Sequence, residues 1–182
     1  MQSLKTYSPP QRFFHWAMAA IILAALGLGL WASFLEAGTP TRKFILEIHK
    51  SLGLTAALLL LPRLTLRLIW PTPATSENEN RTARLAAYAA HWTLYGLMVF
   101  MPITGYMFSA AGGYSLPWFG LFQWPRLLRR DSAIAAAGEW LHDHGAWILY
   151  VVVGLHLAAV CWHQFYKKDA VLSRMLTPRT IK

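Results

Sequence analysis

Residues 139–166 read EWLHDHGAWILYVVVGLHLAAVCWHQFY, a mostly apolar stretch that nevertheless carries four of the seven histidines of the chain. His142 and His156 are 14 residues apart. In an α-helix this spacing returns to within about 40° of the same face and separates the two side chains by about 21 Å along the axis. One membrane-spanning helix would therefore present an imidazole to a metal centre near each side of the bilayer.

The composition indicates a membrane protein of about one domain. Of the 182 residues, 55% are hydrophobic and 14% are charged, whereas about 25% of residues are charged in an average soluble domain. The formal net charge of +9 suits nucleic acid at first sight, but the basic residues stand at the ends of apolar runs, which is typical of membrane topology. We therefore expect no nucleic-acid partner. The single cysteine, Cys161, excludes an intrachain disulfide and a cysteine-based zinc site.

Four apolar segments are long enough to cross a bilayer, which takes about 20 helical residues. Within a single domain of residues 1–182 they cover residues 13–35, 44–70, 85–111 and 140–166. The sequence therefore predicts an all-α membrane protein, with four transmembrane helices in an antiparallel bundle. A cleaved signal peptide is the alternative for the first segment, but that segment is longer than the apolar core of a signal peptide and has His15 near its start.

Two longer connectors separate the spans. Residues 71–84, PTPATSENENRTAR, are polar and are predicted to form a loop. Residues 112–138 combine aromatic side chains with Arg126, Arg129 and Arg130. This mixture favours a segment that lies in the membrane interface, with rings toward lipid or a cofactor and arginines toward water.

The positive charges predict the orientation of the chain in the bilayer. An even number of spans puts both termini on one side, and that side carries eleven lysine and arginine residues against six on the other. Basic residues near span ends gather on the cytoplasmic side of membrane proteins. We therefore expect both termini in the cytoplasm.

With this orientation the histidines pair by depth. His49 and His142 lie toward the outer surface, and His15 and His156 lie toward the cytoplasm. His163, seven residues after His156 and on nearly the same face, is an alternative inner ligand. Two imidazoles at each of two levels suit two haems held by axial histidines in a helix bundle. The sequence has no CxxCH motif for covalent attachment, so the haems are expected to be b-type.

These histidines also have interpretations other than haem ligation. A lone histidine in a span is more often a packed residue with a hydrogen bond, but four that match in depth as two pairs favour a metal. Zinc fits less well, because a structural zinc site takes four protein ligands. His144 lies on a different face from His142 and is expected at the surface or in a hydrogen bond.

Four further polar residues are candidates for the cytoplasmic half. His91 and His163 lie near that surface, where a polar side chain could hydrogen-bond a quinone carbonyl and relay its proton; a structural role at a helix end is an equal alternative. Arg63 and Arg67 are candidates for pairing with haem propionates. Ordinary anchoring of these arginines at the membrane interface is at least as good an interpretation.

Several stretches together resemble the bacterial cytochrome b561 family of small, stand-alone dihaem cytochromes of the inner membrane. They are RFFHW at 12–16, EIHKSLG at 47–53, LPRLTLRLIWPTP at 61–73, MPITGYM at 101–107 and LHDHG…GLHLAAVCWHQFYKKD within 141–169. Each motif is short, and their order and spacing over nearly the whole chain carry the resemblance.

The resemblance implies a ligand set and a location. It places the inner haem between His15 and His156 and the outer haem between His49 and His142, which favours His156 over His163. It also implies a multi-pass protein of the bacterial inner membrane. The most similar members look like superoxide oxidases, which take electrons from superoxide outside the membrane and pass them to ubiquinone.

Three functions compete on this basis. The first is an oxidoreductase, a superoxide:ubiquinone oxidoreductase that works in lipid without an obligate protein partner. The second is a haem membrane-anchor subunit that relays electrons between a dehydrogenase or hydrogenase partner and the quinone pool. The third is a haem-free transporter or structural bundle. If superoxide is the donor, the basic residues on the outer side are expected to gather the anion, namely Arg42, Lys43, Lys50, Arg126, Arg129 and Arg130.

Overall fold

The computed structural model of the chain describes residues 6–70, 73 and 80–176. Four helices in it are long and apolar enough to cross a membrane: α1 (Pro9–Ser33), α2 (Pro40–Ile69), α3 (Arg81–Ala111) and α4 (Ser132–Cys161). A π-helix, η1 (Trp162–Lys167), continues α4, and a short helix, α5 (Ser173–Leu176), follows it. The predicted all-α membrane fold with four spans is confirmed.

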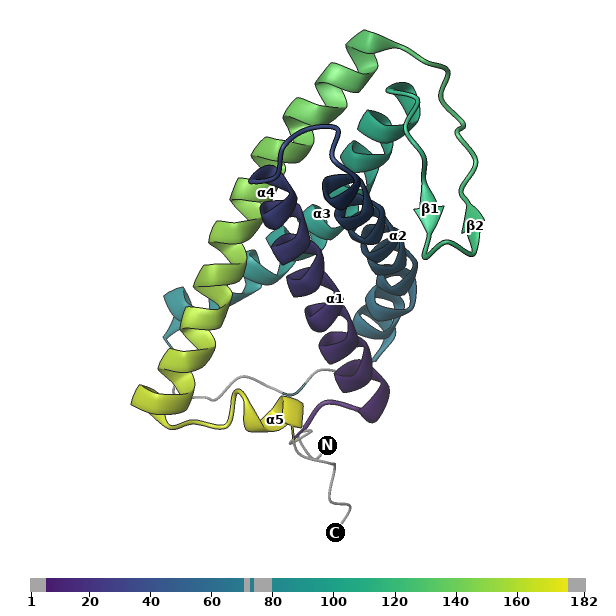
Figure 1. Cartoon of the computed structure of the whole chain (residues 1–182). Coiled ribbons are helices and arrows are strands. Elements are labelled where there is room, and N and C mark those ends of the chain that lie inside the picture. The colour runs from purple at the N-terminus through teal and green to yellow at the C-terminus, as the bar shows by residue number, and fades with distance from the viewer. Residues whose placement is uncertain (1–5, 71–72, 74–79, 177–182) are drawn as a thin grey trace.

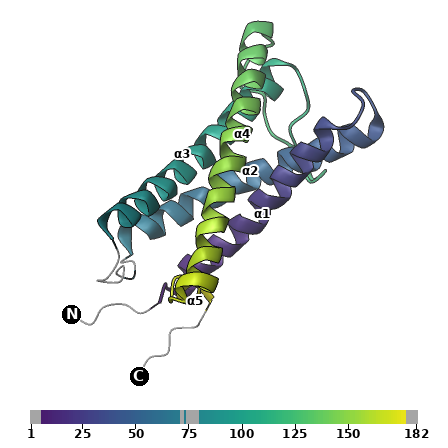
Figure 2. The same ribbon diagram turned by 90° about the vertical axis from the view of Figure 1, so that its left-hand side faces the viewer.

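The long helices associate as two pairs, α1 with α2 and α3 with α4, and α2 also touches α3 (Figure 1). Helix α5 returns to the start of α1, where the Trp16 indole N–H donates to the Met175 carbonyl at 3.1 Å. We call this end of the bundle the terminal end. The opposite end holds the turn between α1 and α2 and the loop between α3 and α4, and we call it the hairpin end (Figure 2).

The helices begin earlier than their apolar segments, because a polar cap and a first turn precede each apolar region. Ser8 caps α1 in a capping box with Gln11. The caps of the other three helices are Thr39, Asn80 and Asp131. The predicted starts at residues 13, 44 and 85 were therefore late by about one turn, and the start at residue 140 by about two.

The loop between α3 and α4 holds a small antiparallel hairpin in which β1 (Pro117–Trp118) pairs with β2 (Phe122–Gln123). The hairpin is fixed to α2 through Ser51, which is 1% exposed. The Ser51 hydroxyl lies 3.1 Å from the Pro117 carbonyl and accepts the Phe119 N–H at 3.0 Å. The segment predicted to lie along the interface is thus a hairpin packed on a span, and residues 132–138 belong to α4.

The other predicted connector, residues 71–84, lies largely outside the described residues. Its last four residues, from Arg81 to Arg84, form the first turn of α3 rather than a loop.

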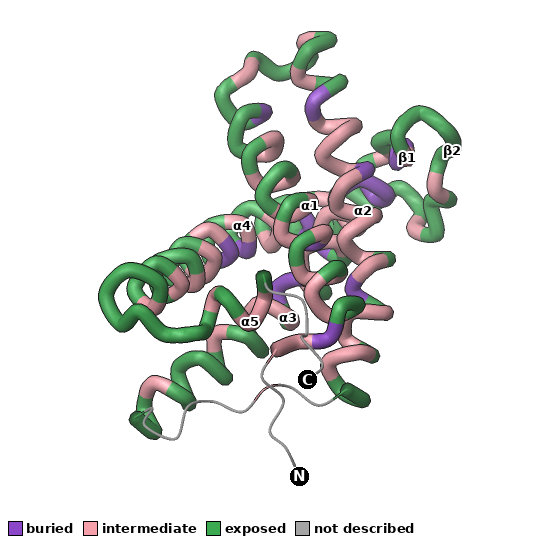
Figure 3. Tube along the Cα trace, turned by 90° about the horizontal axis from the view of Figure 1, so that it is seen from below, coloured by how far each residue is buried: buried purple, intermediate pink, exposed green. Residues whose placement is uncertain are grey.

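Few side chains are buried, and most of the described trace is exposed or half-buried (Figure 3). A small core of Met18, Leu60 and Met98 lies where α1, α2 and α3 meet. Elsewhere large apolar side chains face outward along every span. A soluble protein rarely exposes so large an apolar surface, so this surface is the one that contacts lipid.

Candidate functional site

The two histidines at the hairpin end face each other across the bundle. The ring centres of His49 on α2 and His142 on α4 are 6.0 Å apart, and their planes are inclined by 89°. A metal bound by both would require two metal–nitrogen bonds of about 2 Å and about 1 Å more from each nitrogen to its ring centre. The observed separation equals that sum, so this pair fits one metal ion with two axial imidazoles.

Backbone carbonyls determine which nitrogen of each ring is free. His49 Nδ1 lies 2.8 Å from the Ala25 carbonyl oxygen, and His142 Nδ1 lies 3.1 Å from the Met101 carbonyl oxygen. A carbonyl only accepts, so Nδ1 carries the hydrogen and donates it in both residues. The lone pair is then on Nε2, and this is the tautomer that metal-binding histidines with a second hydrogen bond adopt.

Three histidines gather at the terminal end. The rings of His91 on α3 and His156 on α4 meet with centres 5.7 Å apart and planes inclined by 67°. His15 on α1 interacts electrostatically with both of them. The predicted inner pair, His15 and His156, is therefore in one neighbourhood, and His91 lies directly against His156.

Arg63 of α2 points into this group. Its guanidinium donates to His15 Nδ1 at 3.1 Å and to the His15 carbonyl at 3.4 Å. It also lies over the Tyr95 ring of α3, 5.6 Å from the ring centre. Arg63 therefore contacts side chains of α1 and α3, and its planar fork of donors is of the kind that suits a carboxylate such as a haem propionate. Arg67 interacts electrostatically with His91 in the same region.

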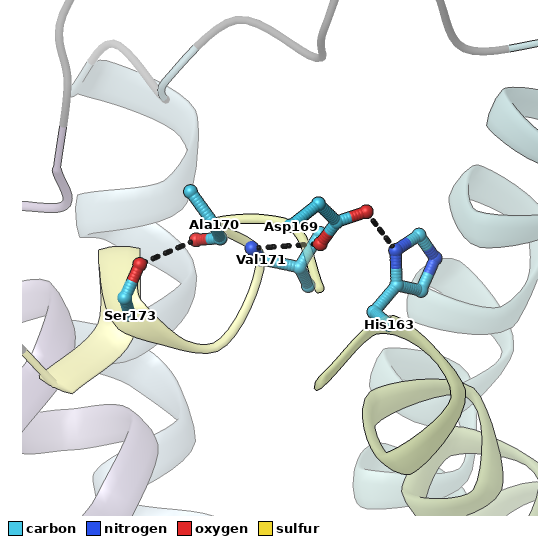
Figure 4. Close-up of polar contacts among 5 residues, drawn as sticks. All are labelled: His163, Asp169, Ala170, Val171 and Ser173. Atoms are coloured by element: carbon cyan, nitrogen blue, oxygen red, sulfur yellow. Dashed lines mark hydrogen bonds and ion pairs between the residues drawn. The ribbon is translucent and has the colours of Figure 1, made fainter. Parts of the chain in front are cut away.

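The remaining two histidines have separate partners. His144 is exposed, with Nδ1 2.8 Å from the Trp140 carbonyl and its ring stacked on that indole at 4.1 Å, as predicted for a surface residue with a hydrogen bond. His163 lies in η1, and its Nδ1 contacts Asp169 Oδ2 at 2.6 Å (Figure 4). Lys168, with φ of 52°, makes the left-handed turn that brings Asp169 back to His163.

Cations converge on one short backbone segment at the hairpin end. The Lys50 ammonium donates to the Ser115 carbonyl at 3.0 Å, and the Arg126 guanidinium donates to the Gly113 carbonyl at 3.0 Å. The Arg130 side chain fills the space where Gly113 lacks a Cβ. The structure therefore brings together three of the six basic residues predicted at this end, one of them adjacent in sequence to His49.

Sequence reasoning missed four residues of these sites. Asp169 and Tyr95 are partners of His163 and Arg63, and Gly29 and Gly105 lie against the rings of His49 and His142. Only the two glycines had a signal in the sequence, because glycine inside a helix costs about 1 kcal/mol relative to alanine and needs a reason.

The donor set fits haem better than an ion bound by protein alone. Within the described residues, no group of three or more His, Cys, Asp or Glu side chains is arranged to hold a metal ion. The hairpin end instead offers two opposed histidines and the terminal end a group of three, and haem needs only axial ligands from the protein.

Comparison with known proteins decides the family. The family described as "Prokaryotic cytochrome b561" matches residues 6–178, nearly the whole chain. The chain belongs to this cytochrome b561 family. It is therefore a membrane haem protein that binds b-type haem, with four spans in the bacterial inner membrane, and the family resemblance of its sequence is confirmed.

Relatives of this cytochrome b561 chain match it over most of their length. "Cytochrome b561 homolog 2" of Escherichia coli (strain K12) is 35% identical over 163 residues, 90% of this chain and 87% of the relative. "Probable superoxide oxidase CybB" of Yersinia pestis is 29% identical over 175 residues, 94% of this chain and 96% of the relative. "Cytochrome b561 homolog 1" of Escherichia coli (strain K12) is 26% identical over 97% of this chain and 99% of the relative.

Proposed function

We propose that this cytochrome holds two b-type haems and is a superoxide:ubiquinone oxidoreductase. Two superoxide anions are oxidised to two O2 at the hairpin end, facing the periplasm, and one quinone takes up the two electrons and two protons at the terminal end, in the cytoplasm. The bound haems supply the one-electron chemistry between the two ends. The observation that carries the proposal is the opposed pair His49 and His142, with a second group of histidines about 21 Å away along α4.

At the hairpin end the assignment of ligands is supported by the opposed rings of His49 and His142. At the terminal end it rests on the family resemblance, because in the structure Arg63 donates to His15 Nδ1 and His91 is the ring that lies against His156. His49 and His142 hold the haem at the hairpin end, and His15 and His156 hold the haem at the terminal end. With two imidazoles supplied to each haem by these residues, the bound iron would have no open site for oxygen, and electrons would be exchanged at the edge of the cofactor. The chain is proposed to work in the lipid bilayer without an obligate protein partner.

Superoxide as the donor is supported by the cations at the hairpin end and by the relative named as a probable superoxide oxidase. The net charge of that end gives little support, because five acidic residues offset its six basic ones. Attraction of the anion must therefore come from the local group of Lys50, Arg126 and Arg130. Such a local field raises the on-rate of a small anion by about ten-fold or more at low salt.

We expect the rate of reduction of the purified protein by superoxide to fall several-fold between low and physiological ionic strength, because salt screens over about 8–10 Å. Replacing Arg130 by glutamine should lower the low-salt rate in stopped-flow measurements and flatten the salt dependence. Arg84→Gln, which removes the same charge at the terminal end, should change neither. A wild-type rate that does not depend on salt would remove the electrostatic role of this group.

The quinone site is proposed at the terminal end, beside His91 and His163. His163 with Asp169 forms an imidazole–carboxylate pair, with 18% and 37% of the side chains exposed. Partial burial raises the pKa of Asp169, but hydrogen bonds from His163 and from the Val171 N–H outweigh this and hold that pKa below its usual value. The carboxylate therefore stays ionised at neutral pH and orients the imidazole that passes a proton to the reduced quinone.

Asp169→Asn is expected to slow quinone reduction at least about ten-fold while both haems remain bound and superoxide still reduces the protein. Because the pKa of Asp169 is lowered, this carboxylate takes up a proton only at a pH below its usual range, and it should add no inflection to the rate between about pH 5 and 8. Quinol formation by the variant, measured across that range, tests this. Equal rates for the variant and the wild type would exclude Asp169 from proton delivery.

The alternative of an anchor subunit for a dehydrogenase has no separate structural support in the described residues. It is distinguished by purification: a chain that reduces quinone without any other protein is not acting as an anchor alone.

A further inference from the structure

The two histidines at the hairpin end pack against a glycine of the neighbouring helix in the same way. An alanine Cβ at Gly29 of α1 would lie 3.1 Å from Cε1 and 3.2 Å from Nδ1 of His49. An alanine Cβ at Gly105 of α3 would lie 3.0 Å from Cε1 and 3.2 Å from Nδ1 of His142. Both separations are shorter than ordinary van der Waals contact, so an added methyl at either glycine would displace the imidazole by a few tenths of an ångström.

The hydrogen bonds of the two rings repeat the same register. His49 Nδ1 contacts the carbonyl of Ala25, four residues before Gly29, and His142 Nδ1 contacts the carbonyl of Met101, four residues before Gly105. In an α-helix that carbonyl already accepts the N–H of the glycine itself. Its second lone pair is free to accept the imidazole N–H. A glycine and the carbonyl one turn before it thus form what we call a seat, and in the described residues one seat lies in each helix pair.

We propose that Gly29 and Gly105 are positioning residues that set the orientation and the donor strength of both axial imidazoles of the haem at the hairpin end. The inference rests on the proposed haem ligation by His49 and His142. The seat holds Nδ1–H on a carbonyl, which fixes the tautomer with Nε2 toward iron and makes the imidazole a stronger donor. A stronger donor stabilises ferric over ferrous iron, so the two seats lower the midpoint potential of this haem.

The two seats differ in one side chain. Thr104, which is 2% exposed, stands one residue before Gly105, and Leu28 stands at the matching place before Gly29. The Thr104 hydroxyl lies 3.2 Å from His142 Nδ1 and can donate to the Phe100 carbonyl at 3.0 Å while it accepts from the imidazole. His142 therefore has a second acceptor if its ring is pushed away from Met101. Among the described residues, the Ala25 carbonyl is the one acceptor that α1 offers to His49 Nδ1.

The decisive experiment is a redox titration of Gly29→Ala and Gly105→Ala in the purified, haem-loaded protein. The matched controls are Gly27→Ala on α1 and Gly96→Ala on α3, because a Cβ at either position meets nothing within 4 Å. Loss of a partner to a metal-bound histidine typically costs about 10–100-fold in affinity. A ten-fold loss of preference for ferric iron raises a one-electron midpoint by about 59 mV.

We expect both seat variants to raise the same one of two midpoints, with the larger shift in Gly29→Ala, and both controls to leave the two midpoints unchanged. The electron paramagnetic resonance signal of the same ferric haem should also move, because it depends on the angle between the axial imidazole planes. The proposed role of the two glycines is also supported if Gly29→Ala or Gly105→Ala loses that one haem while the matched control variant keeps both.

A second variant keeps the test decisive if an added methyl prevents folding. Thr104→Val removes the hydroxyl without adding volume, and it should raise the same midpoint by a smaller amount. The inference is overturned if the wild type binds two haems and the Gly29→Ala and Gly105→Ala variants have the same midpoints as the controls. If neither glycine variant folds, the same outcome for Thr104→Val overturns it. A wild type without two haems would instead overturn the proposed function, and the seats with it.

Discussion

Replacing either His49 or His142 with alanine is expected to remove the same single haem and to leave the other bound. The two ring centres are 6.0 Å apart, the separation expected for two axial ligands of one iron, and each ring is held by a backbone carbonyl. An alanine methyl supplies no ligand and leaves the remaining imidazole as the only protein bond to iron. The ratio of haem to protein, from the reduced-minus-oxidised spectrum, should fall by half in each variant.

His144→Ala is the control for this experiment. His144 is two residues from His142 on the same helix, but it stacks on Trp140 at 4.1 Å and has its own carbonyl partner. It should keep both haems. Combining His49→Ala with His142→Ala should cost no more haem than either change alone, since both remove one site. Two different haems lost in the single variants would show that these histidines do not share an iron.

Replacing His15 or His156 with alanine is expected to remove the other haem and to stop quinone reduction. In these variants the reduction of the remaining haem by superoxide should persist, because the hairpin end is intact. The measurement combines the haem ratio with separate assays of superoxide consumption and quinol formation. A loss confined to quinol formation, with the haem at the hairpin end still reducible, would locate the quinone site at the terminal end.

His91 is the alternative to His15 as the haem ligand opposite His156, and the same experiment distinguishes the two. Its ring meets that of His156 with centres 5.7 Å apart, whereas His15 is held at Nδ1 by Arg63. The family resemblance implies His15 as the ligand opposite His156, so His91→Ala and His163→Ala should both retain two haems. If His91→Ala loses the haem and His15→Ala keeps it, the inner pair is His91 with His156.

The spans could be predicted from sequence because lipid requires long apolar helices and nothing else in the chain meets that length. The depth of each histidine followed in the same way from its distance to the end of its span. The rotation of each helix about its axis could not be predicted from the sequence, because in a membrane protein both the lipid-facing and the core-facing residues of a helix are apolar. That is why Arg63 pointing inward and His91 touching His156 were not foreseen.

The hairpin at Pro117–Gln123 was beyond sequence reasoning for a different reason. Its strands have two residues each, too short for the alternation that marks a strand, and its position depends on contacts with Ser51 and Thr55 far away in the chain. The seats at Gly29 and Gly105 likewise depend on which helices become neighbours. Helix starts were missed by one or two turns because hydropathy does not register polar caps such as Thr39 and Asp131.

The most direct test of the account is the haem-to-protein ratio of the purified wild-type chain, measured with its reduced absorption spectrum. The account predicts two b-type haems per chain, with sharp α and Soret bands on reduction by dithionite. Colourless protein, or a single haem per chain that supports full superoxide-dependent quinone reduction, would contradict it.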